Sequence, residues 1–193
     1  MEFSFISGHI ALDFAGTIGR WRTEPVDLLP APGDMARWCV EAALVDEPPI
    51  VTDEDLEHTH ELRAAIYRLV RAGTTGDAGE VQDRRTLNLA AALPPVRLRL
   101  SDDGSIKRSG DIDASLASIA RAAIELLTGP DRENMRECGQ SECTRLYVDH
   151  SARRSRRWCD MRTCGNRAKA QSFRERHRSV GALEGADGLL PDH

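Results

Sequence analysis

Four cysteines are the residues of this chain whose type and spacing indicate chemistry. They form two pairs, Cys138-x4-Cys143 and Cys159-x4-Cys164, with fifteen residues between the pairs. In a reducing compartment, cysteine pairs indicate a metal site more often than disulfides. Four thiolates fill every coordination position of a zinc ion, so the pattern predicts one structural Zn²⁺ and no catalytic one. Two disulfides, or thiols without a role, are the alternative interpretation.

The segment that carries these cysteines is basic, although the chain as a whole is acidic. Residues 131–180 hold thirteen Arg or Lys and seven Asp or Glu, while the whole chain has a formal net charge of −5. Such an uneven distribution indicates nucleic acid or another acidic partner for the basic part. Arginine dominates, and its planar guanidinium suits phosphate oxygens and guanine edges. We therefore predict contacts to nucleic acid, DNA rather than RNA, from Arg153, Arg154, Arg156, Arg157, Arg167, Lys169, Arg174 and Arg178.

Three functions are compatible with a zinc-held basic module. The first is a DNA-binding regulator, the second an RNA-binding protein, and the third a module in which zinc only shapes a protein-interaction surface. An arginine face that merely keeps the module soluble is also compatible with the pattern. A single finger covers about 600–1,000 Å² of nucleic acid, so one copy would bind weakly. A homodimer formed through the larger domain would bring two fingers to one duplex.

The order of elements around the cysteines predicts a treble-clef-like finger. After the first pair, Leu146–Val148 is expected to be a strand, and Ser151–Ser155 a polar turn that Asp149 holds. Arg156–Trp158 is expected to return toward the metal as the second half of a hairpin. Cys164 then opens a helix. A segment this short cannot bury its own core and needs the metal to fold.

The elements before the finger predict an α+β domain with antiparallel strands. Ile10–Phe14 is expected to be a strand, and helices are expected from Pro32, after the cap Thr52, and over Val81–Ala92. Val96–Leu100 and a strand near Ile106 predict a hairpin. The apolar stripe from Leu116 to Leu127 predicts one more amphipathic helix, and Cys39 is expected in the core. The predicted organisation is a domain over residues 1–130, a finger over 131–180 and a tail over 181–193.

Two segments resemble known families. Trp158–Met161 followed by Cys164–Lys169 resembles the signature of the CGNR zinc finger family. Tyr147–Asp149 and Ser151–Arg157 match its strand and basic turn, whereas His150 stands where the family more often has a small hydroxyl residue. Leu12–Ala15 with Thr17 is similar to the start of the ABATE domain that accompanies this finger, and Glu61–Ala65 lies in the corresponding central helix. The resemblance implies that the four cysteines are zinc ligands. It also implies a stress-linked transcriptional regulator.

A small-molecule effector site in the first 130 residues is a further hypothesis. Asp13, Thr17, Arg63 and Asn88 would line such a pocket, because each interrupts or borders an apolar stretch. Each is equally compatible with a cap, a turn or a surface ion pair.

We expect no enzymatic activity and no membrane partner. No phosphate-binding loop and no His-Glu-x-x-His motif is present in the sequence. No apolar run reaches the ~18 residues of a membrane helix. Glu2 stands where a signal peptide would carry Lys or Arg, so a cytoplasmic location is expected.

Overall fold

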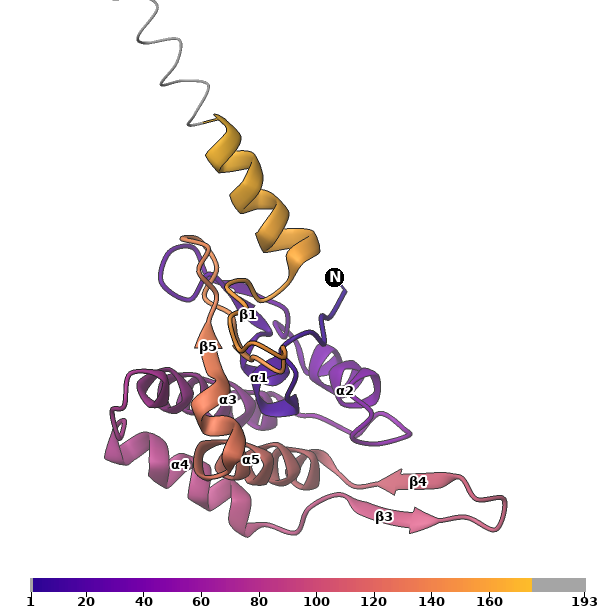
Figure 1. Ribbon diagram of the computed structural model, residues 1–193. Coiled ribbons are helices and arrows are strands. Elements are labelled where there is room, and N and C mark those ends of the chain that lie inside the picture. The colour runs from indigo at the N-terminus through magenta and orange to yellow at the C-terminus, as the bar shows by residue number, and fades with distance from the viewer. Residues whose placement is uncertain (1, 175–193) are drawn as a thin grey trace, which may run out of the picture.

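The protein combines helices with short antiparallel strand pairs, which confirms the predicted α+β class. The computed structural model describes residues 2–174 (Figure 1). Its helices are α1 (Ile10–Ala15), α2 (Pro32–Glu41), α3 (Asp53–Thr74), α4 (Val81–Ala92) and α5 (Ile112–Thr128), the short η1 (Pro130–Asn134) and η2 (Met161–Gly165), and a helix over residues 166–174. Its strands are β1 (Ile18–Gly19), β2 (Val26–Asp27), β3 (Arg97–Leu100), β4 (Ile106–Ser109), β5 (Met135–Glu137) and β6 (Leu146–Val148). β1 pairs with β2, β3 with β4 and β5 with β6, each pair forming a separate two-stranded antiparallel sheet.

Local sequence signals determine where the long helices begin. Thr52 caps α3 with a reciprocal capping box, in which the Asp55 N–H donates to Thr52 Oγ1 and the Thr52 N–H donates to Asp55 Oδ2. Asp111 caps α5 by accepting a hydrogen bond from the Ala114 N–H at 2.9 Å. The predicted helices from Pro32, after Thr52 and over Val81–Ala92 are confirmed.

The main core lies where α1 meets the long helices. α1 packs against both α3 and α5, α4 packs against the same two helices, and α2 packs against α3 (Figure 1). Phe14 on α1 contacts Trp38 on α2, with ring centroids 5.3 Å apart. Apolar stripes on α3 and α5 complete this core, as the 3.6-residue period predicts.

The expected strand over Ile10–Phe14 is instead the helix α1, so this prediction is wrong. His9 caps the helix through its ring nitrogen Nδ1, which accepts a hydrogen bond from the Ala11 N–H at 3.4 Å. Every residue from Ala11 to Ala15 is buried. A short apolar run that is buried all round carries no period, so the sequence pattern does not distinguish a strand from a helix.

The cysteine-bearing segment packs on the main core. Met135, Leu146 and Val148 belong to that core, and the Val148 N–H donates to the Ser7 carbonyl oxygen at 2.8 Å. β6 pairs with β5, whereas Arg156–Trp158 forms no strand in the structure, so the expected hairpin partner is wrong. The boundary at residue 130 and the treble-clef-like topology stay predictions. Across residues 2–174, no helix is both long and apolar enough to cross a bilayer.

Candidate metal centre

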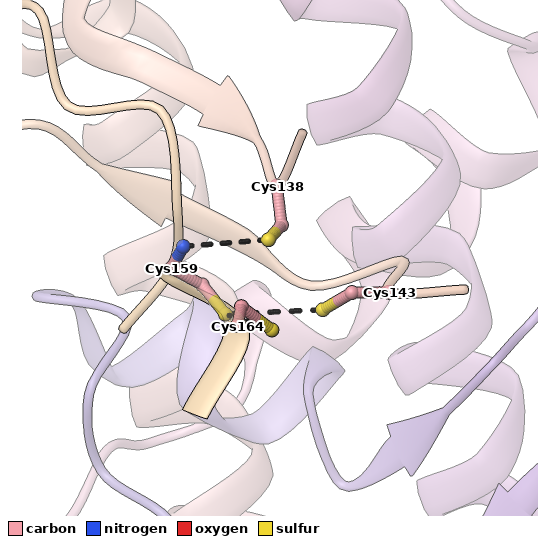
Figure 2. Close-up of side chains that lie close together, drawn as sticks. All are labelled: Cys138, Cys143, Cys159 and Cys164. Carbon is pink, nitrogen blue, oxygen red and sulfur yellow. Dashed lines mark hydrogen bonds between the residues drawn. The ribbon is translucent and has the colours of Figure 1, made fainter. Parts of the chain in front are cut away.

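The structure brings the four predicted cysteines together at one point. Their sulfur atoms all lie within 4.8 Å of one another (Figure 2). Cys138 directly follows β5, and Cys143 closes a turn by donating its N–H to the Gln140 carbonyl oxygen at 2.9 Å. Cys159 lies just before η2, and Cys164 lies within it. Three are buried and Cys143 is half-buried, so this cluster is shielded from solvent.

The sulfur spacing fits a tetrahedral zinc ion. With Zn–S bonds of about 2.3 Å, the edge of the tetrahedron is about 3.8 Å. The sulfur of Cys159 lies 3.8 Å from that of Cys143 and 3.6 Å from that of Cys164. The Cys159 N–H also donates to the Cys138 sulfur at 3.4 Å, which stabilises that sulfur as a thiolate. The four cysteines therefore form a closed site for one structural zinc ion.

The thiols cannot all ionise without a cation between them. Hydrogen bonds from the thiols of Cys143 and Cys159 lower the pKa of Cys138 to about 2. Those same contacts with Cys138 raise the pKa of Cys143 to about 12 and raise the pKa of Cys159. A divalent cation removes this conflict because it stabilises all four thiolates together.

Contacts within the finger hold the two cysteine pairs against each other. The Gly139 N–H donates to the Arg157 carbonyl oxygen at 2.9 Å, and Tyr147 donates its hydroxyl to the Arg156 carbonyl oxygen. Asp149 accepts hydrogen bonds from the Ser151 and Arg156 N–H groups at 3.0 and 2.8 Å. These bonds close the loop of residues 149–156, as the sequence predicted for Asp149.

The predicted nucleic-acid contacts divide into exposed and internal groups. Arg153, Arg154 and Arg157 are exposed on the loop before Cys159. Arg156 is half-buried, since its Nε donates to the Trp158 carbonyl oxygen at 2.7 Å and its guanidinium lies 4.7 Å from the centroid of the Tyr147 ring.

The helix that follows η2 carries the remaining basic residues. Residues 166–174 are helical, and Arg167, Lys169 and Arg174 are exposed there. Arg167 lies 3.8 Å from Glu142, an exposed pair that restrains it little. Arg178 lies outside the described residues, as does the predicted tail.

The four predicted pocket residues do not line one cavity, although Arg63 and Thr17 bond to each other. Arg63 is fully buried on α3, where it makes two 2.7 Å bonds to Asp27 and one of 3.0 Å to Thr17 Oγ1. Asp13 accepts the Ser7 N–H at 2.9 Å. Asn88 alone of the four borders the cavity of about 360 Å³ between α3, α4 and α5.

Arg145 is a residue whose role sequence reasoning missed. Its guanidinium donates to the Ser4 carbonyl oxygen, the Ser7 hydroxyl and the Gly16 carbonyl oxygen at 3.2–3.4 Å. It also lies 3.9 Å from Asp13. Burial raises the pKa of Asp13, while the Ser7 hydrogen bond and Arg145 oppose that rise. Arg145 therefore ties the metal-binding segment to the amino-terminal residues. In the sequence it is one arginine among many, so only contacts between distant segments could identify it.

Comparison with protein families gives two matches. Residues 8–130 match the ABATE family, described as "putative stress-induced transcription regulator". Residues 134–177 match the CGNR zinc finger, which includes all four cysteines. No curated protein matches the chain.

Proposed function

The chain belongs to the ABATE family, and we propose that it is a zinc-dependent transcription regulator whose CGNR finger binds DNA. The amino-terminal part would then sense a small molecule or mediate dimerisation. A homodimer would present two fingers to one duplex, which compensates for the small footprint of each. The proposal assigns zinc a structural role, and assigns no catalytic step to any residue.

The observation that best supports DNA binding is that two exposed arginine-bearing segments each adjoin a cysteine of the zinc site. One segment, with Arg153, Arg154 and Arg157, ends at the ligand Cys159. The other is the helix 166–174, which begins directly after the ligand Cys164. Because zinc fixes both cysteines, it also fixes the starting points of both arginine segments. Preformed cations lose less entropy on binding phosphates than cations on a mobile chain.

The helix favours duplex DNA over duplex RNA. Arg167 and Arg174 are seven residues apart, so they lie on one face of the helix. The major groove of B-DNA admits a helix, whereas the major groove of A-form RNA is too deep and narrow for its side chains. We therefore propose that residues 166–174 contact the major groove while the loop arginines contact phosphates.

The salt dependence of binding tests this proposal. Six exposed cations that each neutralise one phosphate give a slope of log K against log salt of about −5. The assay is fluorescence anisotropy with a mixed-sequence DNA duplex and a structured RNA at matched salt. Arg157→Ala should make the slope shallower by about 0.9. Arg85→Ala is the matched control, because Arg85 is an exposed arginine on α4, in the other matched family segment.

Two outcomes would contradict the DNA proposal. Tighter binding to the structured RNA would favour the RNA-binding alternative. A slope near zero, or one that Arg157→Ala leaves unchanged, would favour a protein-interaction module shaped by zinc.

The cavity beside Asn88 supports the sensing part of the proposal. Its volume of about 360 Å³ falls within the range of about 300–1,000 Å³ typical of ligand sites. Leu69, Leu87 and Ile124 line it with apolar surface, and Arg132 adds a cation. A fragment screen by protein NMR should find acidic, partly apolar compounds that shift the side-chain amide of Asn88. No such shift across the screen would reject this cavity as the effector site.

A further inference from the structure

The β3–β4 hairpin is an exposed element that the proposed function leaves without a role. It projects from the helices at the end of the molecule away from the helix 166–174 (Figure 1). Leu98, Leu100 and Ile106 on it are 66%, 75% and 44% exposed. An isolated two-stranded hairpin is marginally stable in water, and exposed aliphatic side chains on a strand edge favour association.

The strand register gives the hairpin two different faces. Leu100 pairs with Ile106, and Leu98 pairs with Arg108, so the three aliphatic side chains share one face. Arg99 pairs with Lys107 on the other face, next to Arg97. Across residues 2–174, these last three cations have no ion-pair partner, whereas Arg108 lies 3.7 Å from Asp46.

A groove beside the root of the hairpin has the complementary chemistry. A cavity of about 350 Å³ there, which we call the α4–α5 groove, is lined by Leu89, Leu93, Leu116, Glu61 and Asp113 among others. Leu89 and Leu93 are 64% and 42% exposed. Glu61 and Asp113 are exposed and have no ion-pair partner in the part of the chain that the structure describes. The groove thus offers exposed leucines flanked by unpaired carboxylates.

The hairpin cannot reach the groove of its own chain. Two contacts hold its root: the Val96 N–H donates to Ser118 Oγ at 2.9 Å, and the Arg108 N–H donates to Asp46 Oδ2 at 2.9 Å. The strands then run away from the root, where Leu93 and Asp113 lie. A second chain related by a two-fold axis could place its hairpin antiparallel to the first, so that each tip approaches the other's root.

We propose that the β3–β4 hairpin is a dimerisation arm that docks in the α4–α5 groove of a second copy of this chain. The hairpin lies between the helices that form the groove, so that its aliphatic face packs on Leu89 and Leu93 of α4 and its end, and its opposite, cationic face lies toward Glu61 on α3 and Asp113 on α5. Because the contact is exchanged, it forms twice in one dimer. This dimer rests on the homodimer of the proposed function, but its formation requires no nucleic acid.

Nucleic acid fits the hairpin less well than a second copy does. Three aliphatic side chains occupy one face, where phosphates would offer them no apolar surface.

Sedimentation equilibrium of the zinc-loaded full chain, without nucleic acid, tests the arm. The expected result is a dimer whose dissociation constant rises about tenfold or more in Ile106→Glu, since the variant loses apolar burial. Val26→Glu is the matched control, because Val26 is a β-branched residue with 43% exposure on β2, outside the hairpin and the groove. The control should sediment like the unmodified protein.

A mixing experiment separates docking from misfolding. Arg99→Glu and Glu61→Arg should each weaken the dimer, whereas an equimolar mixture of the two should restore it, because both exchanged contacts then join opposite charges.

A monomeric unmodified protein, an unchanged dimer in Ile106→Glu, or no recovery on mixing would overturn the proposal. An Ile106→Glu protein that dimerises normally but binds DNA more weakly would assign the hairpin to nucleic acid instead. Loss of DNA binding with an intact arm-dependent dimer would reject only the proposed function.

Discussion

Replacing Arg145 by methionine tests whether the finger depends on the rest of the protein. Methionine keeps the length of the apolar stem but removes the donors to Ser4, Ser7 and Gly16. It also removes the cation 3.9 Å from Asp13, whose side chain is 9% exposed. We therefore expect the variant to be less stable and its metal-binding segment to be attached more loosely to the rest of the protein.

The size of the effect follows from these contacts. A hydrogen bond to a charged group contributes about 1.5–3 kcal/mol at good geometry. The bonds of Arg145 are long, at 3.2–3.4 Å, so each should contribute less than this. The unpaired carboxylate adds a further cost. We expect the free energy of unfolding to fall by roughly 2–4 kcal/mol at pH 7.

The pH dependence provides a second readout of the same variant. Burial raises the pKa of Asp13, because folding disfavours the charged carboxylate relative to the unfolded chain. Because the pKa of Asp13 is higher in the folded protein than in the unfolded chain, stability is lost as the pH rises through the folded pKa, where the charged carboxylate must be buried. Arg145 offsets part of that cost. The difference between the variant and the unmodified protein should therefore shrink between pH 7 and pH 5.

Urea denaturation followed by circular dichroism at both pH values measures these differences. Arg162→Met is the control, because Arg162 is exposed beside the metal centre. It should change stability by less than about 0.5 kcal/mol. Equal stability of Arg145→Met and Arg162→Met would refute the assignment of Arg145 as the tie between the two parts.

Two further substitutions test the buried ion pair and the loop. Asp27→Asn should destabilise the protein by about 3 kcal/mol at pH 7, because it leaves the buried Arg63 guanidinium without its carboxylate. Burial raises the pKa of Asp27, but hydrogen bonds from Arg63 outweigh this effect and lower it below its usual range. The stability that the ion pair contributes should therefore be present above the pKa of an unfolded aspartate and be lost as the pH falls through the lower folded pKa. Urea denaturation at a series of pH values measures this loss. Arg154→Gly should weaken DNA binding in the anisotropy assay, because it removes an exposed cation. It should leave stability unchanged or raise it by up to about 1 kcal/mol, because Arg154 has a positive φ of 46°, a backbone conformation that glycine adopts more readily than arginine. A stability loss in Arg154→Gly would show that the side chain supports the finger instead.

The helices and the hairpin could be predicted because their signals are local. The capping pattern at Thr52 and the alternation of Val96–Leu100 each act within a few residues. The four cysteines could be predicted for a similar reason, since ligand type and spacing largely define a zinc site. The Ile10–Phe14 segment failed because a fully buried run has no period to distinguish a helix from a strand.

Contacts between distant segments could not be predicted from local patterns. Arg63 was expected at a pocket, but its partners Asp27 and Thr17 lie 36 and 46 residues away in the chain. Leu146 and Val148 were expected in a strand of the finger, and the structure shows that this strand also packs in the main core. A side chain with an unknown distant partner is equally compatible with a ligand site and an internal bond.

X-ray absorption at the zinc edge, with the metal content of the same sample, tests whether the four cysteines hold a zinc ion. We expect one zinc per chain and a first shell of four sulfur atoms at about 2.3 Å. Cys164→Ser should remove one sulfur from that shell and weaken DNA binding. Protein purified without chelators that holds no zinc, or zinc bound by nitrogen and oxygen atoms, would contradict a thiolate-held finger.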